Sequence, residues 1–214
     1  MSAYEWVARV GGEGGPLLVC AEASFAGWGG AVLDDDYELD PACDYARAHA
    51  VLYPEDDDEL EAGLVRFGAD QVGLVWEMDG PGGADVAAGG DGLLVVRSWV
   101  RNSDAPRRYA AGAAARERER PVAELELELS GGQVAVVWAP AGAAEATRTG
   151  NRLDLEHMLG VGAVLPLAPG RYRASCGWLE GRRGRYAPAE EQHGPPVEGN
   201  DDDWSCRWLR LTQL

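Results

Sequence analysis

Apolar and acidic residues alternate strictly between positions 123 and 129 of this chain of 214 residues. An extended strand places alternate side chains on opposite faces. One face would carry Ala123, Leu125, Leu127 and Leu129, and the other Glu124, Glu126 and Glu128. The face that carries the glutamates must therefore be exposed to solvent. A turn at residues 130–132 and a second apolar run at 133–138 predict that the two segments form a β-hairpin.

Short apolar segments separated by glycine, proline and charged residues recur along the chain, which is typical of strands. The nearly continuous apolar run at residues 93–100 predicts a central strand. Further strands are expected at residues 17–20, 162–167, 171–179 and 204–211, and a hairpin at 64–67 with 72–78. Helices are expected near residues 40–52, after Pro54 and at 105–120, a mobile loop at 79–92, and a long surface loop at 180–203.

These elements predict an α+β fold, mainly antiparallel β-sheet with few helices, in a single compact domain over residues 1–214. No stretch reaches the roughly 20 apolar residues that a membrane span requires. The first residues lack a basic region followed by a long apolar run, which a secretory signal would show. We therefore expect a cytoplasmic location and no membrane partner.

The charge is unevenly distributed. The chain has a net charge of −17 from 19 arginines and 36 acidic residues, and it contains no lysine. Residues 1–100 hold 20 acidic residues and 4 arginines, and the segment 34–61 holds 12 acidic residues beside the single Arg47. Such a field repels nucleic acid and speeds encounter with a basic protein. The alternative is a solvated surface that only aids solubility.

The segment 34–61 cannot be buried without partners of opposite charge, so we expect it to form an exposed rim that binds a basic protein. The predicted partner-binding residues are Asp34, Asp35, Asp36, Glu38, Asp56, Asp57, Asp58 and Trp28. Trp28 lies between glycines just before this segment and would serve as an aromatic anchor if exposed. Packing in the core is the alternative for this side chain.

Motifs for common catalytic and metal sites are missing. Without lysine there is no Walker A loop and no Schiff-base lysine. His49, His157 and His193 are far apart in the sequence. Cys43 and His49 together supply only two ligands, which is fewer than a zinc site needs. The Asp34-x-Asp36-x-Glu38 run imitates a calcium loop but has Leu39 where glycine is needed. We predict no cofactor, no metal ion and no catalytic residue.

Cys176 and Cys206 each belong to a period-two apolar pattern. We expect both thiols to be reduced and to lie on the core face of neighbouring strands, near Trp178 and Trp204. Neighbouring strands would also allow a bridge between them on oxidation. A cysteine nucleophile would need a nearby histidine, and His157 is a candidate only if the fold brings it close.

Several short segments, in order, resemble the bacterial immunity protein 21 family. They include Glu5-Trp6, Gly14-Gly15-Pro16-Leu17-Leu18, Trp28-x-Gly30, Asp44-Tyr45-x-Arg47-Ala48, residues 63–78, residues 90–100 with Ser103-Asp104, Pro169-Gly170-Arg171-Tyr172-Arg173 and Trp208-Leu209-x-Leu211. Long insertions around residues 79–90 and 180–203 depart from the family. The resemblance implies a protein that binds a cognate toxin and blocks it.

The acidic charge of the chain is consistent with the toxin partner that this resemblance implies. Toxins that cut nucleic acid present basic clefts, and an acidic surface can occupy such a cleft in place of phosphates. We therefore expect a toxin-neutralising immunity protein of a polymorphic toxin system. The alternatives are a structural or scaffold subunit of a larger bacterial assembly, and a small enzyme using Cys176 or Cys206 with a histidine.

Overall fold

A computed structural model describes residues 4–54, 60–76, 82–89, 92–99, 123–182, 185–187 and 203–214. Three expectations lie outside these residues: the helix at 105–120, the first residues of the helix expected after Pro54, and the acidic residues Asp56, Asp57 and Asp58. His193 also lies outside them. None of the described helices is long and apolar enough to cross a membrane.

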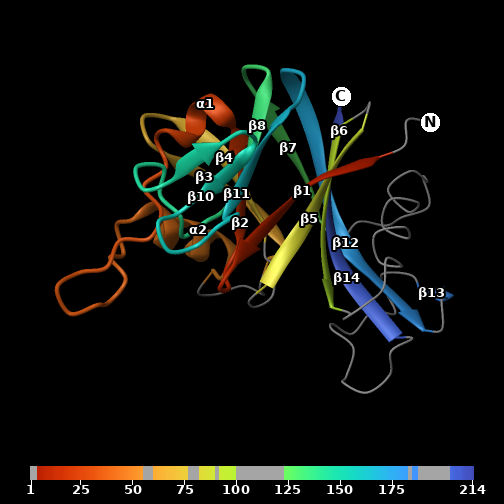
Figure 1. The fold of residues 1–214 in the computed structure, drawn as a ribbon, viewed down its shortest axis with the longest axis horizontal. Helices are drawn as coiled ribbons and strands as arrows, with labels where there is room; N and C mark the ends of the chain where they lie inside the picture. The colour runs from red at the N-terminus through yellow and green to blue at the C-terminus, as the bar shows by residue number, and fades with distance from the viewer. Residues whose placement is uncertain are drawn as a thin grey trace.

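The fold is α+β and mostly antiparallel, built from two sheets that face each other (Figure 1). Sheet A contains, in spatial order, β1 (Glu5–Gly12), β5 (Gly82–Gly89), β6 (Gly92–Trp99), β14 (Asp203–Gln213), β12 (Gly170–Arg182) and β13 (Arg185–Ala187), with β7 (Ala123–Leu129) also paired to β12. Sheet B contains β3 (Ala62–Phe67), β4 (Gln71–Trp76), β2 (Leu17–Ala21), β8 (Gln133–Trp138), β11 (Gly162–Pro166), β10 (Arg152–Asp154) and β9 (Thr147–Thr149).

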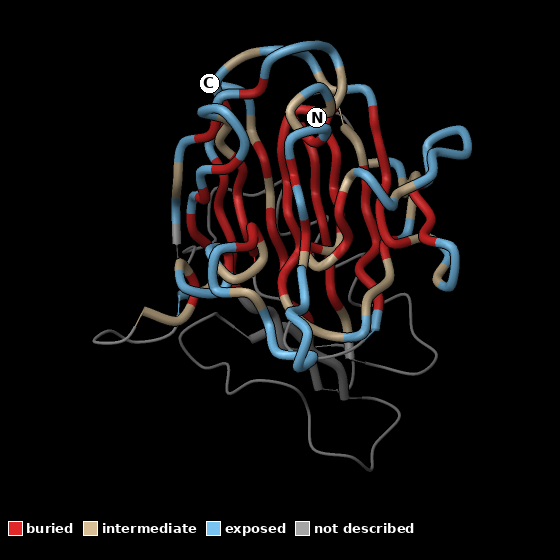
Figure 2. Tube along the Cα trace, turned by 90° about the vertical axis from the view of Figure 1, so that its left-hand side faces the viewer, coloured by how far each residue is buried: buried red, intermediate tan, exposed pale blue. Residues whose placement is uncertain are grey.

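The main core lies between the two sheets, and alternation along each strand determines which side chains enter it. Leu17 and Val19 of β2 pack there with Val134 and Val136 of β8. Sheet A contributes side chains of the opposite wall, including Leu93, Val95, Leu209 and Leu211. Figure 2 shows that burial follows the strands, whereas the connecting loops are exposed.

A second core covers the outer face of sheet B. The short helix α1 (Glu22–Phe25) and α2 (Asp44–Leu52) lie on this side (Figure 1). Ala48 and Leu52 of α2 are fully buried in a cluster with Leu18 of β2 and Val137 of β8. The Cys43 sulfur caps α2 by accepting a hydrogen bond from the Ala46 N–H. The expected helix near residues 40–52 is therefore confirmed over its second part.

Several other expectations are confirmed. The hairpin at 64–78 is formed by β3 and β4, and β6 occupies a central position between β5 and β14. β12 and β14 are neighbours over most of their length. The glutamates of β7 are exposed, whereas Leu127 and Leu129 are buried.

The hairpin expected at residues 122–138 is wrong. β7 pairs with β12 in sheet A, whereas β8 lies in sheet B between β2 and β11. The physical reason is a difference in burial. β7 has one face exposed to solvent. Residues Val134 to Val137 of β8 are buried on both faces, and they therefore need a packing layer against each face of their sheet, which sheet B has. The turn at 130–132 therefore carries the chain from one sheet to the other.

The mobile loop expected at residues 79–92 is also wrong, because residues 82–89 form β5 between β1 and β6. Small side chains allow this strand to pack closely, and its Asp85 is buried and paired with Arg9 at 3.2 Å. The surface loop expected at 180–203 is wrong at its ends. β12 continues to Arg182, β13 follows, and β14 begins at Asp203.

Gly92 begins β6 with φ of 150°, and a Cβ atom there would lie 1.8 Å from the Leu211 carbonyl oxygen. We expect Gly92→Ala to lower the free energy of unfolding by more than about 2 kcal/mol, since backbone rather than a movable side chain blocks the space. Gly132→Ala is the matched control, because nothing lies within 4 Å of its Cβ position. Urea denaturation of both variants checks this, and equal midpoints would contradict the described register of β6 and β14.

Candidate functional site

The acidic residues 34–38 lie at the tip of a projecting loop, which we call the acidic loop (residues 32–40; orange in Figure 1). Its two sides are joined by a bridge between Leu33 and Leu39 and by a hydrogen bond from the Asp40 N–H to the Val32 carbonyl, 2.8 Å. Residues 32–39 are all exposed. The expectation of an exposed acidic rim is therefore met for this stretch.

Asp34 organises the tip of the acidic loop. One carboxylate oxygen accepts hydrogen bonds from the backbone N–H groups of Asp36 and Glu38, both at 2.9 Å. The Asp34 N–H donates to the Glu38 carbonyl at 2.8 Å, and the Tyr37 N–H donates to the Asp34 carbonyl at 3.1 Å. This turn holds Tyr37 at φ of 62°, in the left-handed region. Asp34 thus positions the loop in addition to contributing charge.

The other acids of the tip are exposed to solvent. Among the described residues, no arginine forms an ion pair with Asp35, Asp36 or Glu38. Two acids further along the segment 34–61 are instead used by the fold. Asp44 is buried and paired with Arg47, and the partly buried Glu61 is paired with Arg207 of β14 at 3.3 Å. The whole segment is therefore not an exposed rim.

Trp28 is buried, at 1% exposure, so its assignment as an exposed aromatic anchor is wrong. Its indole N–H donates to the Ala139 carbonyl at 2.8 Å, and its ring packs edge-on against Phe67, with centroids 5.2 Å apart. Core packing, the alternative given in the sequence analysis, is what the structure shows. Trp28 therefore anchors the chain to the core a few residues before the acidic loop.

The two glycines after Trp28 fix the base of the acidic loop to neighbouring segments. The Gly29 N–H donates to the Asp44 carboxylate at 2.6 Å, and the Gly30 carbonyl accepts from the Tyr45 N–H at 3.1 Å. Gly30 has φ of 68°, and a Cβ atom there would lie 2.4 Å from the backbone nitrogen of Gly142. Only glycine permits this approach. The base is therefore held by α2 on one side and by the segment after β8 on the other.

Tyr37 is the residue that sequence reasoning missed. Its side chain is 85% exposed at the tip of the acidic loop. Val32, Leu33 and Leu39 are also exposed, so four of the eight exposed large hydrophobic residues in the described part of the chain lie within eight positions. The available signal was a lone aromatic residue inside an acidic run that lacks any apolar periodicity.

Cys176 and Cys206 lie on opposite faces of sheet A. Cys176 points into the core between the sheets and pairs with Leu209, whereas Cys206 pairs with Leu179. Since Leu209 faces that core and Cys206 lies three residues away on the same strand, Cys206 points to the opposite face of sheet A. The expectation for Cys206 and the idea of a bridge are therefore wrong, although both thiols are buried and outside any disulfide. His49 and His157 are exposed.

Burial raises the pKa of the Cys20 thiol to about 12, with a smaller contribution from the charge of Glu22. A thiol in this state is not a nucleophile at neutral pH. Within the described ranges, no group of three or more His, Cys, Asp or Glu side chains is placed to hold a metal ion.

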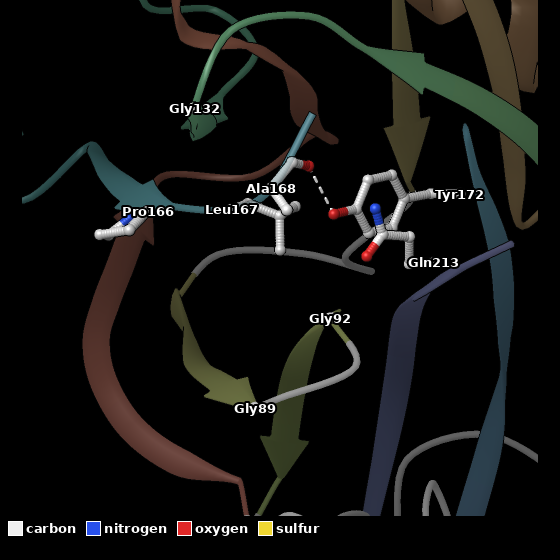
Figure 3. Close-up of a pocket in the computed structure, with 8 residues that line it drawn as sticks. All are labelled: Gly89, Gly92, Gly132, Pro166, Leu167, Ala168, Tyr172 and Gln213. Carbon is white, nitrogen blue, oxygen red and sulfur yellow. Dashed lines mark hydrogen bonds between the residues drawn. The ribbon is translucent and has the colours of Figure 1, made fainter. Parts of the chain in front are cut away.

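A small cavity of about 260 Å³ opens at one end of the two sheets (Figure 3). Its polar side chains are engaged within the protein, since the Tyr172 hydroxyl donates to the Ala168 carbonyl at 2.6 Å and the Gln213 amide donates to the Pro169 carbonyl at 3.3 Å. Burial raises the pKa of Tyr172. The eight lining residues include no carboxylate, imidazole or thiol, so the cavity lacks the groups expected of a hydrolytic site.

In comparisons with known proteins, no family model, curated protein or solved structure matches this chain. Membership of the immunity protein 21 family stays a prediction. The acidic loop, with its fixed base and exposed tip, is the candidate functional site on the geometry alone.

Trp28 and Tyr37 should differ sharply when truncated. We expect Trp28→Ala to lower the free energy of unfolding by about 3–5 kcal/mol, because it leaves a large cavity and an unpaired carbonyl. Tyr37→Ala should change this free energy by less than about 0.5 kcal/mol, because the ring is exposed. Thermal and urea unfolding measure both. Similar losses for the two variants would mean that Tyr37 packs against the protein.

The four cysteines should be nearly unreactive in the folded protein. All four are buried, and a raised pKa means that Cys20 is almost wholly protonated at pH 8. We expect a thiol-specific disulfide reagent to modify four groups rapidly in guanidinium chloride and none on the same timescale in native buffer. Rapid modification of native Cys176 or Cys206 would restore the case for a cysteine nucleophile.

Proposed function

We propose that this chain is a toxin-neutralising immunity protein, which binds a cognate bacterial toxin through the acidic loop and blocks it. The observation that carries the proposal is the exposure of Asp35, Asp36 and Glu38 without arginine partners in the described part of the chain. Two acids further along the same segment, Asp44 and Glu61, are by contrast paired with arginine inside the fold. A basic cleft of a toxin that acts on nucleic acid supplies the complementary charge.

The fixed base of the acidic loop supports the same proposal. The hydrogen bonds of Trp28, Gly29 and Gly30 hold the loop before any partner arrives. A preorganised loop loses little conformational entropy on binding, which favours the high affinity that neutralising a toxin requires. The resemblance to the immunity protein 21 family points to the same class of partner. The proposal includes a cytoplasmic location, which agrees with four cysteines that form no disulfide.

The decisive experiment looks for a toxin gene next to the gene for this chain and expresses its toxin domain with and without this chain. Co-expression of the two is expected to rescue growth of cells that the toxin alone kills. An adjacent gene for a capsid, sheath or secretion component, with copurification of that component and no rescue, would favour a scaffold subunit instead.

The charge of the acidic loop should control the rate of association. We expect the triple variant Asp35→Asn, Asp36→Asn, Glu38→Gln to associate about tenfold more slowly with that toxin domain at low salt, and with a weaker salt dependence. Asp34 is left in place because it organises the turn. Stopped-flow kinetics at several salt concentrations measures both effects.

The control is Glu124→Gln, Glu128→Gln, Glu156→Gln, which removes the same charge from exposed sites on β7 and before β11. This control should associate nearly as fast as the natural chain. Equal slowing in the two triple variants would show that only net charge matters, and that the acidic loop is not the interface.

A further inference from the structure

We infer that Tyr37 is the anchor of this interface: with Leu33 and Leu39 it enters an apolar pocket inside the basic cleft of the partner protein, while the acids around it steer the encounter. This inference rests on the proposed function and adds to it the side chain that holds the complex together. It commits to a folded basic protein as the occupant.

Exposure is the first argument. Tyr37 is 85% exposed, the largest value among the exposed large hydrophobic residues of the described chain. Leu33 and Leu39 are cross-strand partners in the isolated bridge at the neck of the loop, so their side chains lie on the same side. Apolar surface rimmed by charged residues is typical of protein interaction sites. The other exposed large hydrophobics, Leu60, Leu64, Leu159 and Leu214, lie outside this stretch.

Backbone geometry is the second argument. Tyrosine seldom adopts a positive φ, yet Tyr37 is held at 62° by the turn that Asp34 organises. The turn thus fixes the backbone at Tyr37, and the residue is exposed to solvent at the tip of the acidic loop. Tyrosine is among the residues most enriched in interface hot spots, because it brings a large rigid surface with few rotatable bonds.

Charge selects the kind of occupant. Asp34, Asp35, Asp36 and Glu38 surround Tyr37 in the sequence and are all exposed. A nucleic acid or an anionic membrane would meet this tip with like charge, and so would a second copy of a chain whose net charge is −17. A basic protein surface is the occupant that both the ring and the carboxylates fit.

The contributions of the acids and of the Tyr37 ring can be told apart by the rates of association and dissociation. Charges at the rim of an interface act mainly on the association rate, whereas a buried aromatic anchor acts on the dissociation rate. Neutralising the acids should therefore slow association, and removing the ring should speed dissociation.

The experiment measures the rates at which this chain associates with, and dissociates from, the purified toxin domain that the co-expression experiment identifies. The proteins compared are the natural full chain, Tyr37→Ala, Tyr37→Phe and Leu159→Ala. We expect Tyr37→Ala to dissociate at least about 30-fold faster with little change in association, which is the size of a hot-spot effect. Tyr37→Phe keeps the ring and should stay within about fivefold of the natural chain. Leu159→Ala removes an apolar side chain elsewhere that is 71% exposed, and it should have no effect.

Each outcome is decisive. If Tyr37→Ala dissociates like the natural chain while neutralising the acids still slows association, the anchor is wrong and the proposed function stands. If the natural chain neither binds the toxin domain nor rescues growth, the proposed function fails and the anchor fails with it. Circular dichroism and the unfolding midpoint of Tyr37→Ala confirm that the variant is folded.

Discussion

The burial of β2 and β8 on both faces is the constraint on which the rest of the structure depends. The five residues of β2 are all buried, and so are Val134 to Val137 of β8. Their inner side chains pack against sheet A, while Leu18, Cys20, Ala135 and Val137 face the helices and the Trp28 region. Both layers therefore take their position from this central pair of strands, and so does the base of the acidic loop.

The segment from Trp28 to Tyr45 combines a buried support with an exposed tip. At its start, Trp28 and Gly30 contact residues 139–142, which directly follow β8. At its end, the Asp44 carboxylate returns to the Gly29 N–H and joins the loop to α2. Between these fixed points the chain leaves the protein surface and exposes Tyr37 and its acidic neighbours. Because both ends of the segment are fixed to the protein, the position of the exposed loop between them is also defined.

Charge in this protein has two separate uses. Buried or partly buried acids are paired with arginine, as Asp85 is with Arg9 and Glu61 with Arg207, because an unpaired charge in the interior is costly. The Arg207 pair also links β14 of sheet A to the residue before β3 of sheet B. The acids at the tip of the acidic loop remain exposed to water, where they cost the fold little, and there we propose that they bind the partner.

The sequence by itself determined that strands predominate over helices, which faces of β7 are exposed and buried, the β3–β4 hairpin and the exposure of residues 34–38, because period-two alternation and charge are local properties. Only the tertiary structure decided that β7 pairs with β12 instead of β8, that Cys206 faces away from Cys176, and that residues 82–89 form a strand. Strand partners depend on burial contributed by residues far apart in the chain. For the same reason Trp28 is buried and Tyr37 exposed: Ala139 and Phe67 take up the Trp28 indole, whereas the turn at Asp34 directs Tyr37 outward, where no part of the described chain covers it.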